Sequence, residues 1–273
     1  METKEWYFMD SGIHSPAYNM ALDEYLLDRG RTGDRVPILR FYQWDPPGLS
    51  IGYFQKTAGR IDKNGLQNHG FELVRRLTGG LAVLHHEELT YSVVIPEGDP
   101  SMPHSILGAY RVLSRGLLEG FHALGLQAEL ATPEPKKNAG HSPVCFEEAS
   151  WYELVVEGKK AAGSAQTRQK GMILQHGSIP LHVDQNELFD CFVYANERVK
   201  ERAKHAFSGK AIALDQIAGR TLTMAEVKQA FSNGFMKGLG ISLKPLVLTE
   251  ADKQSVEELA DKKYAAEAWN YAR

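Results

Sequence analysis

Three strand-like runs separated by two short glycine turns constrain the fold of this chain more than any other feature. The runs are Trp151–Val156, Lys160–Gln166 and Met172–Leu181, and the turns between them are Glu157-Gly158 and Gln169-Lys170-Gly171. Turns this short join neighbouring strands that run in opposite directions. We therefore expect an antiparallel sheet in the second half of the chain.

Helical patterns surround these strands. Apolar residues keep helical spacing from Ser105 to Leu124, which predicts a long amphipathic helix. Ser15-Pro16 predicts the start of an earlier helix that Gly30 would end. Two capping boxes, which begin at Thr223 and Thr249, predict two further helices near the C-terminus.

Strands and helices do not alternate strictly along the chain, so a doubly wound parallel sheet is disfavoured. We expect an α+β fold with a mixed, largely antiparallel central sheet flanked by helices. We further expect a main domain over residues 1–248 and a C-terminal helical extension, residues 249–273, packed on it.

Charge and cysteine content exclude several classes of protein. The 273 residues include 31 Lys and Arg against 34 Asp and Glu, a net charge of −3, whereas nucleic-acid-binding proteins usually carry a basic excess. No apolar run approaches the roughly 20 residues that cross a bilayer, and Met1–Asp10 lacks the apolar core of a secretory signal. The two cysteines make no disulfide scaffold and no zinc site, so we expect a cytoplasmic protein that binds neither nucleic acid nor membrane.

The run Arg75-Arg76-Leu77-Thr78-Gly79-Gly80, with His85 five residues further on, is the first candidate site. Two glycines after a strand allow the backbone to approach a ligand closely, and their N–H groups can face a carbonyl or phosphate oxygen. The adjacent arginines suit an anionic group. The alternative is a hairpin turn flanked by solvated arginines.

Two runs of small residues form the second candidate site. They are Gly163-Ser164-Ala165-Gln166 and His176-Gly177-Ser178, on neighbouring predicted strands. Small residues within strands often mark a place where a ligand lies against the backbone, so these runs would line one groove. A bulge, or tight packing under a helix, would explain them equally well.

Cys145 is the candidate nucleophile, although a lone cysteine is more often a small buried hydrophobe. It follows the proline-rich run 131–143, whereas Cys191 lies in an apolar run and is expected in the core. The lysine pair Lys159-Lys160 follows the next turn, and a nearby ammonium would stabilise a thiolate. With a turn at Glu157-Gly158, Lys160 pairs near Val155.

His85-His86-Glu87-Glu88 resembles a metal-binding run, but consecutive side chains of a strand point to opposite faces. The two histidines therefore cannot hold one ion there. The helical H-E-x-x-H pattern is absent from the sequence, and we expect no metal site.

Together, these runs resemble the biotin/lipoate ligase and lipoyl-octanoyltransferase superfamily, and within it the octanoyltransferases. The resemblance covers nearly the whole chain, and its most specific parts are Ser15–Asp23, Glu88–Ser92 and Val144-Cys145-Phe146. It implies a mixed α+β fold like the catalytic domains of that superfamily. Where the ATP-using ligases have His-Asp-x-Gly-Asn, this chain has His85-His86, which is a departure from the ligase pattern.

The resemblance implies transfer of octanoate from octanoyl-acyl carrier protein to a lipoyl-domain lysine, typically of the glycine cleavage H protein, without a cofactor. Cys145 stands at the position of the acyl-thioester cysteine and Lys160 at that of the lysine that lowers its pKa. The acyl slot would lie between the glycine turn and the strand from Gly163. The candidate substrate-binding residues are Arg76, Thr78, Gly79, Gly80, His85, Gly163, Ser164, Ala165, Gln166, His176, Gly177 and Ser178.

Three other functions stay open at this stage. An amidotransferase of the same fold would take octanoate from the H protein and use the same cysteine. An ATP-dependent lipoate–protein ligase would need ATP and magnesium but no cysteine. A lipoyl-domain-binding protein without turnover would form no acyl adduct. The base that deprotonates the acceptor lysine is also open, with His85 and His176 as candidates that could equally be structural.

Overall fold

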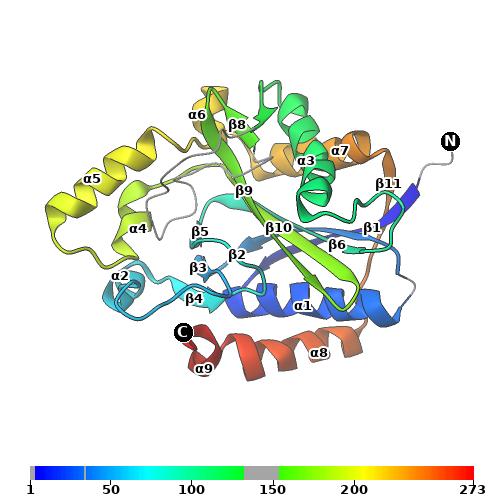
Figure 1. The fold of residues 1–273 in the computed structure, drawn as a ribbon, viewed down its shortest axis with the longest axis horizontal. Coiled ribbons are helices and arrows are strands. Elements are labelled where there is room, and N and C mark those ends of the chain that lie inside the picture. Colours follow the sequence, from blue (N-terminus) through cyan, green and yellow to red (C-terminus); the bar gives the residue numbers. More distant parts are fainter. Residues whose placement is uncertain (1–3, 34, 132–153) are drawn as a thin grey trace.

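The structure, a computed structural model, describes residues 4–33, 35–131 and 154–273. Its centre is an eight-stranded sheet in the order β11-β1-β2-β6-β10-β9-β8-β7 (Figure 1). The strands are β11 (Ile241–Pro245), β1 (Lys4–His14), β2 (Ile38–Trp44), β6 (Glu88–Pro96), β10 (Met172–Pro180), β9 (Lys159–Gln169), β8 (Leu154–Val156) and β7 (Glu129–Leu130). Only β1 with β2 and β1 with β11 pair in parallel among these strands, and the other neighbours are antiparallel. The largely antiparallel mixed sheet is thus confirmed.

The three predicted antiparallel strands correspond to β8, β9 and β10. The turn before β9 holds Glu157 at φ 51° and Gly158 at φ 74°, and the turn after it holds Lys170 at φ 53° and Gly171 at φ 81°. Two successive residues with positive φ make the turn type whose twist matches paired antiparallel strands. The predicted residues 151–153 lie outside the described part of the chain.

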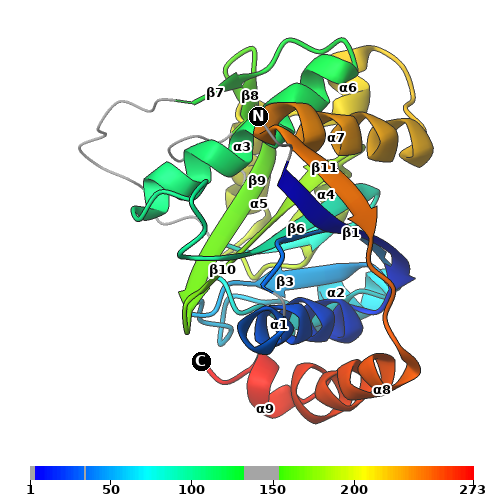
Figure 2. The same cartoon turned by 90° about the vertical axis from the view of Figure 1, so that its right-hand side faces the viewer.

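Helices cover both faces of this sheet (Figure 2). On one face α3 (Ile106–Ala123) and α7 (Met224–Leu239) pack against each other and against the sheet. On the other face lies α1 (Pro16–Thr32), which is backed by α8 (Glu250–Leu259) and the π-helix η2 (Ala260–Tyr264). The helix predicted from Ser105 and those predicted from both capping boxes are confirmed.

The start of α1 is also confirmed, because Ser15 caps it and Pro16 occupies its first turn. The predicted end at Gly30 is wrong, since the helix continues to Thr32 and ends at Gly33. Gly30 packs against the sheet instead: a Cβ there would lie 2.5 Å from the Met172 Cε atom of β10, so the flexible end of that side chain would have to move. The missing side chain therefore allows the helix to approach the sheet closely.

A second sheet has the order β4-β3-β5 and lies beside the end of the first. Its strands are β4 (Glu72–Arg75), β3 (Gly48–Ile51) and β5 (Val83–His85). The short helices α2 (Lys63–His69), α4 (Gln185–Asp190) and α5 (Glu197–Ser208) surround it, with α6 (Leu214–Ala218) and α9 (Glu267–Asn270) further along the chain (Figure 1). Because β4 and β5 lie on opposite sides of β3, the glycine turn between them is no hairpin. That alternative for residues 75–80 is wrong.

The last helices complete the side of the molecule that α1 covers. Val256 of α8 and Ala260 of η2 belong to the same buried cluster as Leu26 and Leu27 of α1. Among the described residues, no helix is both long and apolar enough to span a bilayer.

Candidate active site

A cavity with about 410 Å³ of empty volume lies between the two sheets, on the face of the main sheet that α1 covers. We call it the acyl cavity, after the acyl slot that the resemblance predicts at this place. Its floor is apolar and is formed by Met20, Tyr42 and Trp44. Of the predicted binding residues, the lining includes Arg76, Gly80, His85, Gly163, Ser164, Ala165, His176, Gly177 and Ser178. The structure therefore brings both predicted runs to one place.

The other three predicted binding residues lie next to this cavity. Thr78 is buried and bonds His176 behind the wall, with 2.6 Å between Oγ1 and Nε2. Gly79 and Gln166 line a neighbouring open cleft, together with aromatic residues such as Phe54. The glycine turn is packed directly on Gly52, where a Cβ would lie 2.0 Å from the Gly80 carbonyl oxygen.

Arg76 shapes the glycine turn from inside. Its guanidinium donates to the carbonyl oxygens of Ser50, Gly79 and Leu81 at 3.0, 2.7 and 2.8 Å. It also donates to the hydroxyls of Ser50 and Thr78 at 3.1 Å each. Only 4% of Arg76 is exposed, so the alternative of a solvated arginine is wrong. A buried guanidinium held by several acceptors fixes the turn in one shape.

Arg75 points the other way and ties the turn to the C-terminus. Its guanidinium donates to the carbonyl oxygens of Trp269 and Asn270 at 3.2 and 2.9 Å, and to those of residues 52, 53 and 55. Its backbone N–H donates to Asn270 Oδ1 at 2.8 Å. Both arginines therefore hold protein carbonyls in this structure.

Asp23 of α1 organises a buried polar network under the cavity. Its carboxylate accepts from Arg40 Nη1 at 2.8 Å, from the Tyr42 and Ser92 hydroxyls at 2.9 and 2.8 Å, and from His176 Nδ1 at 2.9 Å. Burial opposes ionisation, but these hydrogen bonds and the Arg40 charge prevail, and the pKa of Asp23 is lowered. The ionised carboxylate holds His176 Nδ1–H, which leaves Nε2 to accept from the Thr78 hydroxyl.

A second hydrogen-bonded network of the same kind lines the cavity itself. His85 Nδ1 donates to Glu88 Oε1 at 3.0 Å, and its Nε2 accepts from the Ser50 hydroxyl at 2.8 Å. Trp44 stacks on the imidazole with centroids 4.0 Å apart. The Thr90 hydroxyl also donates to Glu88 Oε1, whereas the buried Oε2 has no partner among the described residues.

A β-bulge decides where Lys160 points. In the pairing of β8 with β9, Leu154 lies opposite Ala162 and Val155 lies opposite Lys160, so Ala161 is the extra residue. Leu154, Ala161 and Ala162 all belong to the core under α3 and α7. Because side chains alternate along a strand and opposed residues share a face, Val155 and Lys160 point to the other face.

That other face is the one that lines the acyl cavity, since Gly163 and Ala165 belong to it. Lys160 is 2% exposed, and its backbone N–H donates to the Lys210 carbonyl at 2.7 Å. Lys159 is only partly buried and faces away, as predicted from alternation.

The two cysteines differ in what the structure says of them. Cys145 lies outside the described residues, so its pairing with Lys160 stays a prediction. Cys191 is fully buried among the side chains around the small sheet, as predicted. Burial raises the pKa of its thiol to about 12, which makes it a poor nucleophile.

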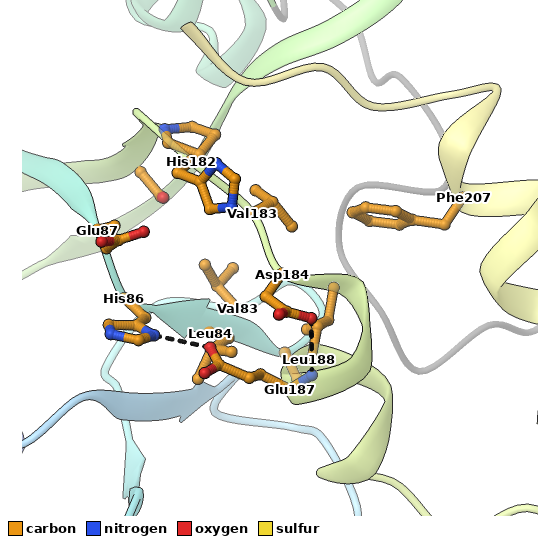
Figure 3. A pocket seen from close by; sticks show the side chains of 13 residues that line it. Val83, Leu84, His86, Glu87, His182, Val183, Asp184, Glu187, Leu188 and Phe207 are labelled. Atoms are coloured by element: carbon orange, nitrogen blue, oxygen red, sulfur yellow. Dashed lines mark hydrogen bonds and ion pairs between the residues drawn. The ribbon is translucent and has the colours of Figure 1, made fainter. Parts of the chain in front are cut away.

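A second cavity, with about 510 Å³ of empty volume, lies on the far side of β5 (Figure 3). His86 points into it and bonds Glu187 of α4, with 2.8 Å between Nδ1 and Oε2. His85 lines the acyl cavity and His86 the second one, but β5 ends at His85 and His86 lies in the bend after it, so the prediction that both belong to one strand is wrong. Val83 and Ser178 line both cavities, so little more than their side chains separates them. Within the described residues, no group of three or more potential ligands is arranged to hold a metal ion.

Several residues of the site were not identified from the sequence: Met20, Asp23, Arg40, Tyr42, Trp44, Ser50 and Glu88. A signal existed for three of them. Met20 and Asp23 belong to the run Ser15–Asp23, and Glu88 belongs to the run Glu88–Ser92; both runs carried the family resemblance, although no role was assigned to these residues. Ser50 lies mid-strand with no motif around it, and only the packing of β3 against Arg76 and His85 reveals it.

Known proteins resemble this chain over nearly its whole length. Residues 15–236 match the family model of the lipoyl protein ligase A/B catalytic domain. The chain is 53% identical over 278 aligned positions to octanoyltransferase LipM of Geobacillus kaustophilus, with both chains covered completely. It is 51% identical over 276 positions to octanoyltransferase LipM of Staphylococcus aureus, with 99% of this chain and 100% of that protein covered.

Solved structures support the same fold. The bipartite lipoate protein ligase of Thermoplasma acidophilum, described with its E2 lipoyl domain, superposes with a TM-score of 0.80 at 26% identity. The match covers 98% of this chain and 96% of that one. A lipoate-protein ligase A bound with ATP gives a TM-score of 0.77 at 26% identity and covers 98% of both chains.

Proposed function

The chain belongs to the lipoyl protein ligase A/B catalytic domain family, and from this premise we propose that it is an octanoyltransferase of lipoate biosynthesis. It is an acyltransferase that moves an octanoyl group onto a protein lysine. The full-length similarity to two octanoyltransferases is the observation that carries this conclusion. The acyl cavity, with an apolar floor and polar walls, suits a thioester with an aliphatic chain.

We propose a two-step reaction through Cys145. Its thiolate attacks the octanoyl thioester, a new C–S bond forms, and the carrier's thiol leaves. The acceptor amine then attacks the enzyme thioester, the amide forms and Cys145 is released. A covalent intermediate divides one transfer into two easier steps, and neither needs ATP because a thioester is already activated. Lys160, turned to the cavity face by the bulge, is suited to stabilise the thiolate.

The donor in this proposal is octanoyl-acyl carrier protein, and the acceptor is a lipoyl-domain lysine, with the glycine cleavage H protein first. We propose the nine predicted residues that line the acyl cavity as the binding surface for the acyl group and its carbonyl, with Thr78, Gly79 and Gln166 beside it. A reducing compartment keeps a thiol nucleophile from oxidation, which supports a cytoplasmic location.

Intact-protein mass after mixing with octanoyl carrier protein alone tests the covalent step. We expect the wild-type enzyme to gain one octanoyl group. Cys145→Ser should gain none as a thioester and lose transfer, while Cys191→Ser should behave as wild type because that thiol is buried. An enzyme that transfers octanoate fully after Cys145→Ser would contradict the mechanism.

The same assay separates the competing functions. If only octanoyl H protein serves as donor, the chain is an amidotransferase. If the Cys145→Ser variant transfers free octanoate or lipoate with ATP and magnesium, the chain is a ligase, which is what the two solved neighbours are named. If the acceptor binds but no acyl group moves under any condition, the chain is a binding protein.

A further inference from the structure

Two hydrogen-bonded chains of side chains, each made of a hydroxyl, an imidazole and a carboxylate, meet at the Arg76 guanidinium beside the acyl cavity. One chain is Ser50–His85–Glu88 and the other is Thr78–His176–Asp23. Arg76 donates to both hydroxyls, through Nη1 to Ser50 and through Nε to Thr78, at 3.1 Å each. The two chains have the same connectivity, so the difference between their surroundings decides what each can do.

The buried charges in the hydrogen-bonded chain through His176 are already balanced. Asp23 carries a negative charge that Arg40 already neutralises at 2.8 Å, and its four hydrogen bonds use both oxygens. A proton added to His176 would therefore be an additional, uncompensated buried charge. Burial lowers the pKa of His176 accordingly. Thr78 is fully buried and does not line the cavity, so this hydrogen-bonded chain has a structural role.

The chain through His85 differs on each of these points. Glu88 is buried, no cation bonds it among the described residues, and its Oε2 has no partner there. A proton on His85 would form an ion pair with this carboxylate and compensate its charge. The other charged groups that face His85 are Arg76, across Ser50, and His176. Trp44 covers one side of the ring.

Ser50 opens this chain to the cavity. A hydroxyl has one proton and two lone pairs. The Ser50 proton is donated to His85 Nε2 and one lone pair accepts from Arg76, which leaves one lone pair on a residue that lines the cavity. That lone pair can accept an N–H group.

We propose that Ser50–His85–Glu88 is the proton relay that deprotonates the acceptor lysine. The idea rests on the proposed function, because it needs an amine acceptor. The lysine ammonium gives one proton to the Ser50 oxygen while the Ser50 proton passes to His85 Nε2. The neutral amine then attacks the thioester carbon, the C–N bond forms and the C–S bond breaks. The second amine proton goes to the departing sulfur, and His85 releases its proton to solvent.

The test compares two acceptors for octanoate from octanoyl carrier protein: a lipoyl-domain protein and hydroxylamine. The lysine is protonated at neutral pH, whereas hydroxylamine is largely a free amine and needs no base from the enzyme. His85→Gln keeps a donor for Glu88 and an acceptor for Ser50 but takes up no proton. We expect it to lose about 100-fold or more in transfer to the lysine and to keep transfer to hydroxylamine within a few-fold.

The pH profile gives a second readout. Lysine transfer by His85→Gln should keep rising into the alkaline range, because the amine must then deprotonate in solution. His86→Gln, at the adjacent residue that lines the second cavity, should match wild type with both acceptors. Ser50→Ala should behave as His85→Gln does, which guards against a folding defect of one variant, and thermal melting checks the fold of each.

Equal loss with both acceptors, or lysine transfer retained by His85→Gln and Ser50→Ala, would overturn the relay. An octanoyl adduct mapped to Ser50 would overturn it as well and would make that hydroxyl a nucleophile. Wild-type enzyme that acylates neither acceptor would instead refute the proposed function.

Discussion

Lys160 of β9 lies directly opposite Val155 of β8, although Leu154 next to Val155 pairs with Ala162. One extra residue in β9 therefore reverses the face on which Lys160 would lie by strict alternation from Gly163. Without it, the ammonium would point into the apolar core under α3 and α7. The bulge places the lysine on the face of the acyl cavity, in keeping with the frequent occurrence of bulges next to active sites.

We expect Lys160→Met to abolish octanoyl transfer, with a loss of about 100-fold or more. Methionine has a similar volume, so the variant should still fold, and its free energy of unfolding can be compared with that of the wild type. Lys159→Met is the matched control, because that side chain faces the other way and should retain activity. Transfer assays with urea unfolding measure both quantities, and full activity in Lys160→Met would refute the role of the lysine.

Deleting Ala161 should remove the bulge and turn position 160 into the core. An ammonium there would have to be desolvated among apolar side chains, so we expect a loss of several kcal/mol in the free energy of unfolding and loss of transfer. Combining the deletion with Lys160→Leu should restore most of the stability but none of the activity, because leucine suits the core. If the double change is no more stable than the deletion alone, the bulge does not set the direction of this side chain.

How far the sequence predicts this molecule depends on the range of the interactions involved. Local signals were sufficient for the antiparallel strands around Lys160 and for the helix caps at Ser105, Thr223 and Thr249. Gly30 was misjudged because its role is set by Met172, which is far away in the chain. The same holds for residues 75–80, since the partner strand that separates β4 from β5 comes earlier in the sequence.

The candidate site also contains both residues that the local sequence predicts and residues that it does not. The small-residue runs at Gly163 and His176 were recognisable because they lie on neighbouring strands, and they do meet at the cavity. Ser50 and Asp23 were not, since each acts through contacts with residues distant in sequence. The domain division at residue 248 and the role of Cys145 stay predictions.

The pH dependence of stability should carry opposite contributions from two histidines. Burial lowers the pKa of His176 below its ordinary 6.5, so the unfolded state binds more protons and stability is lost as the pH falls through the folded-state value. The Asp215 hydrogen bond raises the pKa of His182, whose contribution is present below pH 6.5 and is lost as the pH rises through its folded-state value.

Urea unfolding as a function of pH measures both contributions. As the pH falls below about 6.5, we expect His176→Gln to flatten the decline in stability. As the pH rises above about 6.5, we expect His182→Gln to remove the decline that His182 contributes there. Parallel curves for wild type and both variants would show that neither imidazole changes its proton affinity on folding.

Asn270 should affect the acyl cavity from a distance. Its Oδ1 accepts from the Arg75 backbone and its Nδ2 donates to the Tyr264 carbonyl, both at 2.8 Å, so it joins the C-terminal helices to the strand that precedes the glycine turn. Asn270→Ala leaves these buried groups unpaired and should cost about 1–3 kcal/mol of the free energy of unfolding. Because Arg76 follows directly and holds Gly79, we also expect a higher KM for the acyl donor with a smaller change in kcat.

The control is Asn233→Ala on α7, where the side chain is exposed and bonds only Gln229 among the described residues. Unchanged stability and KM in Asn270→Ala would mean that the turn is held by Arg76 alone.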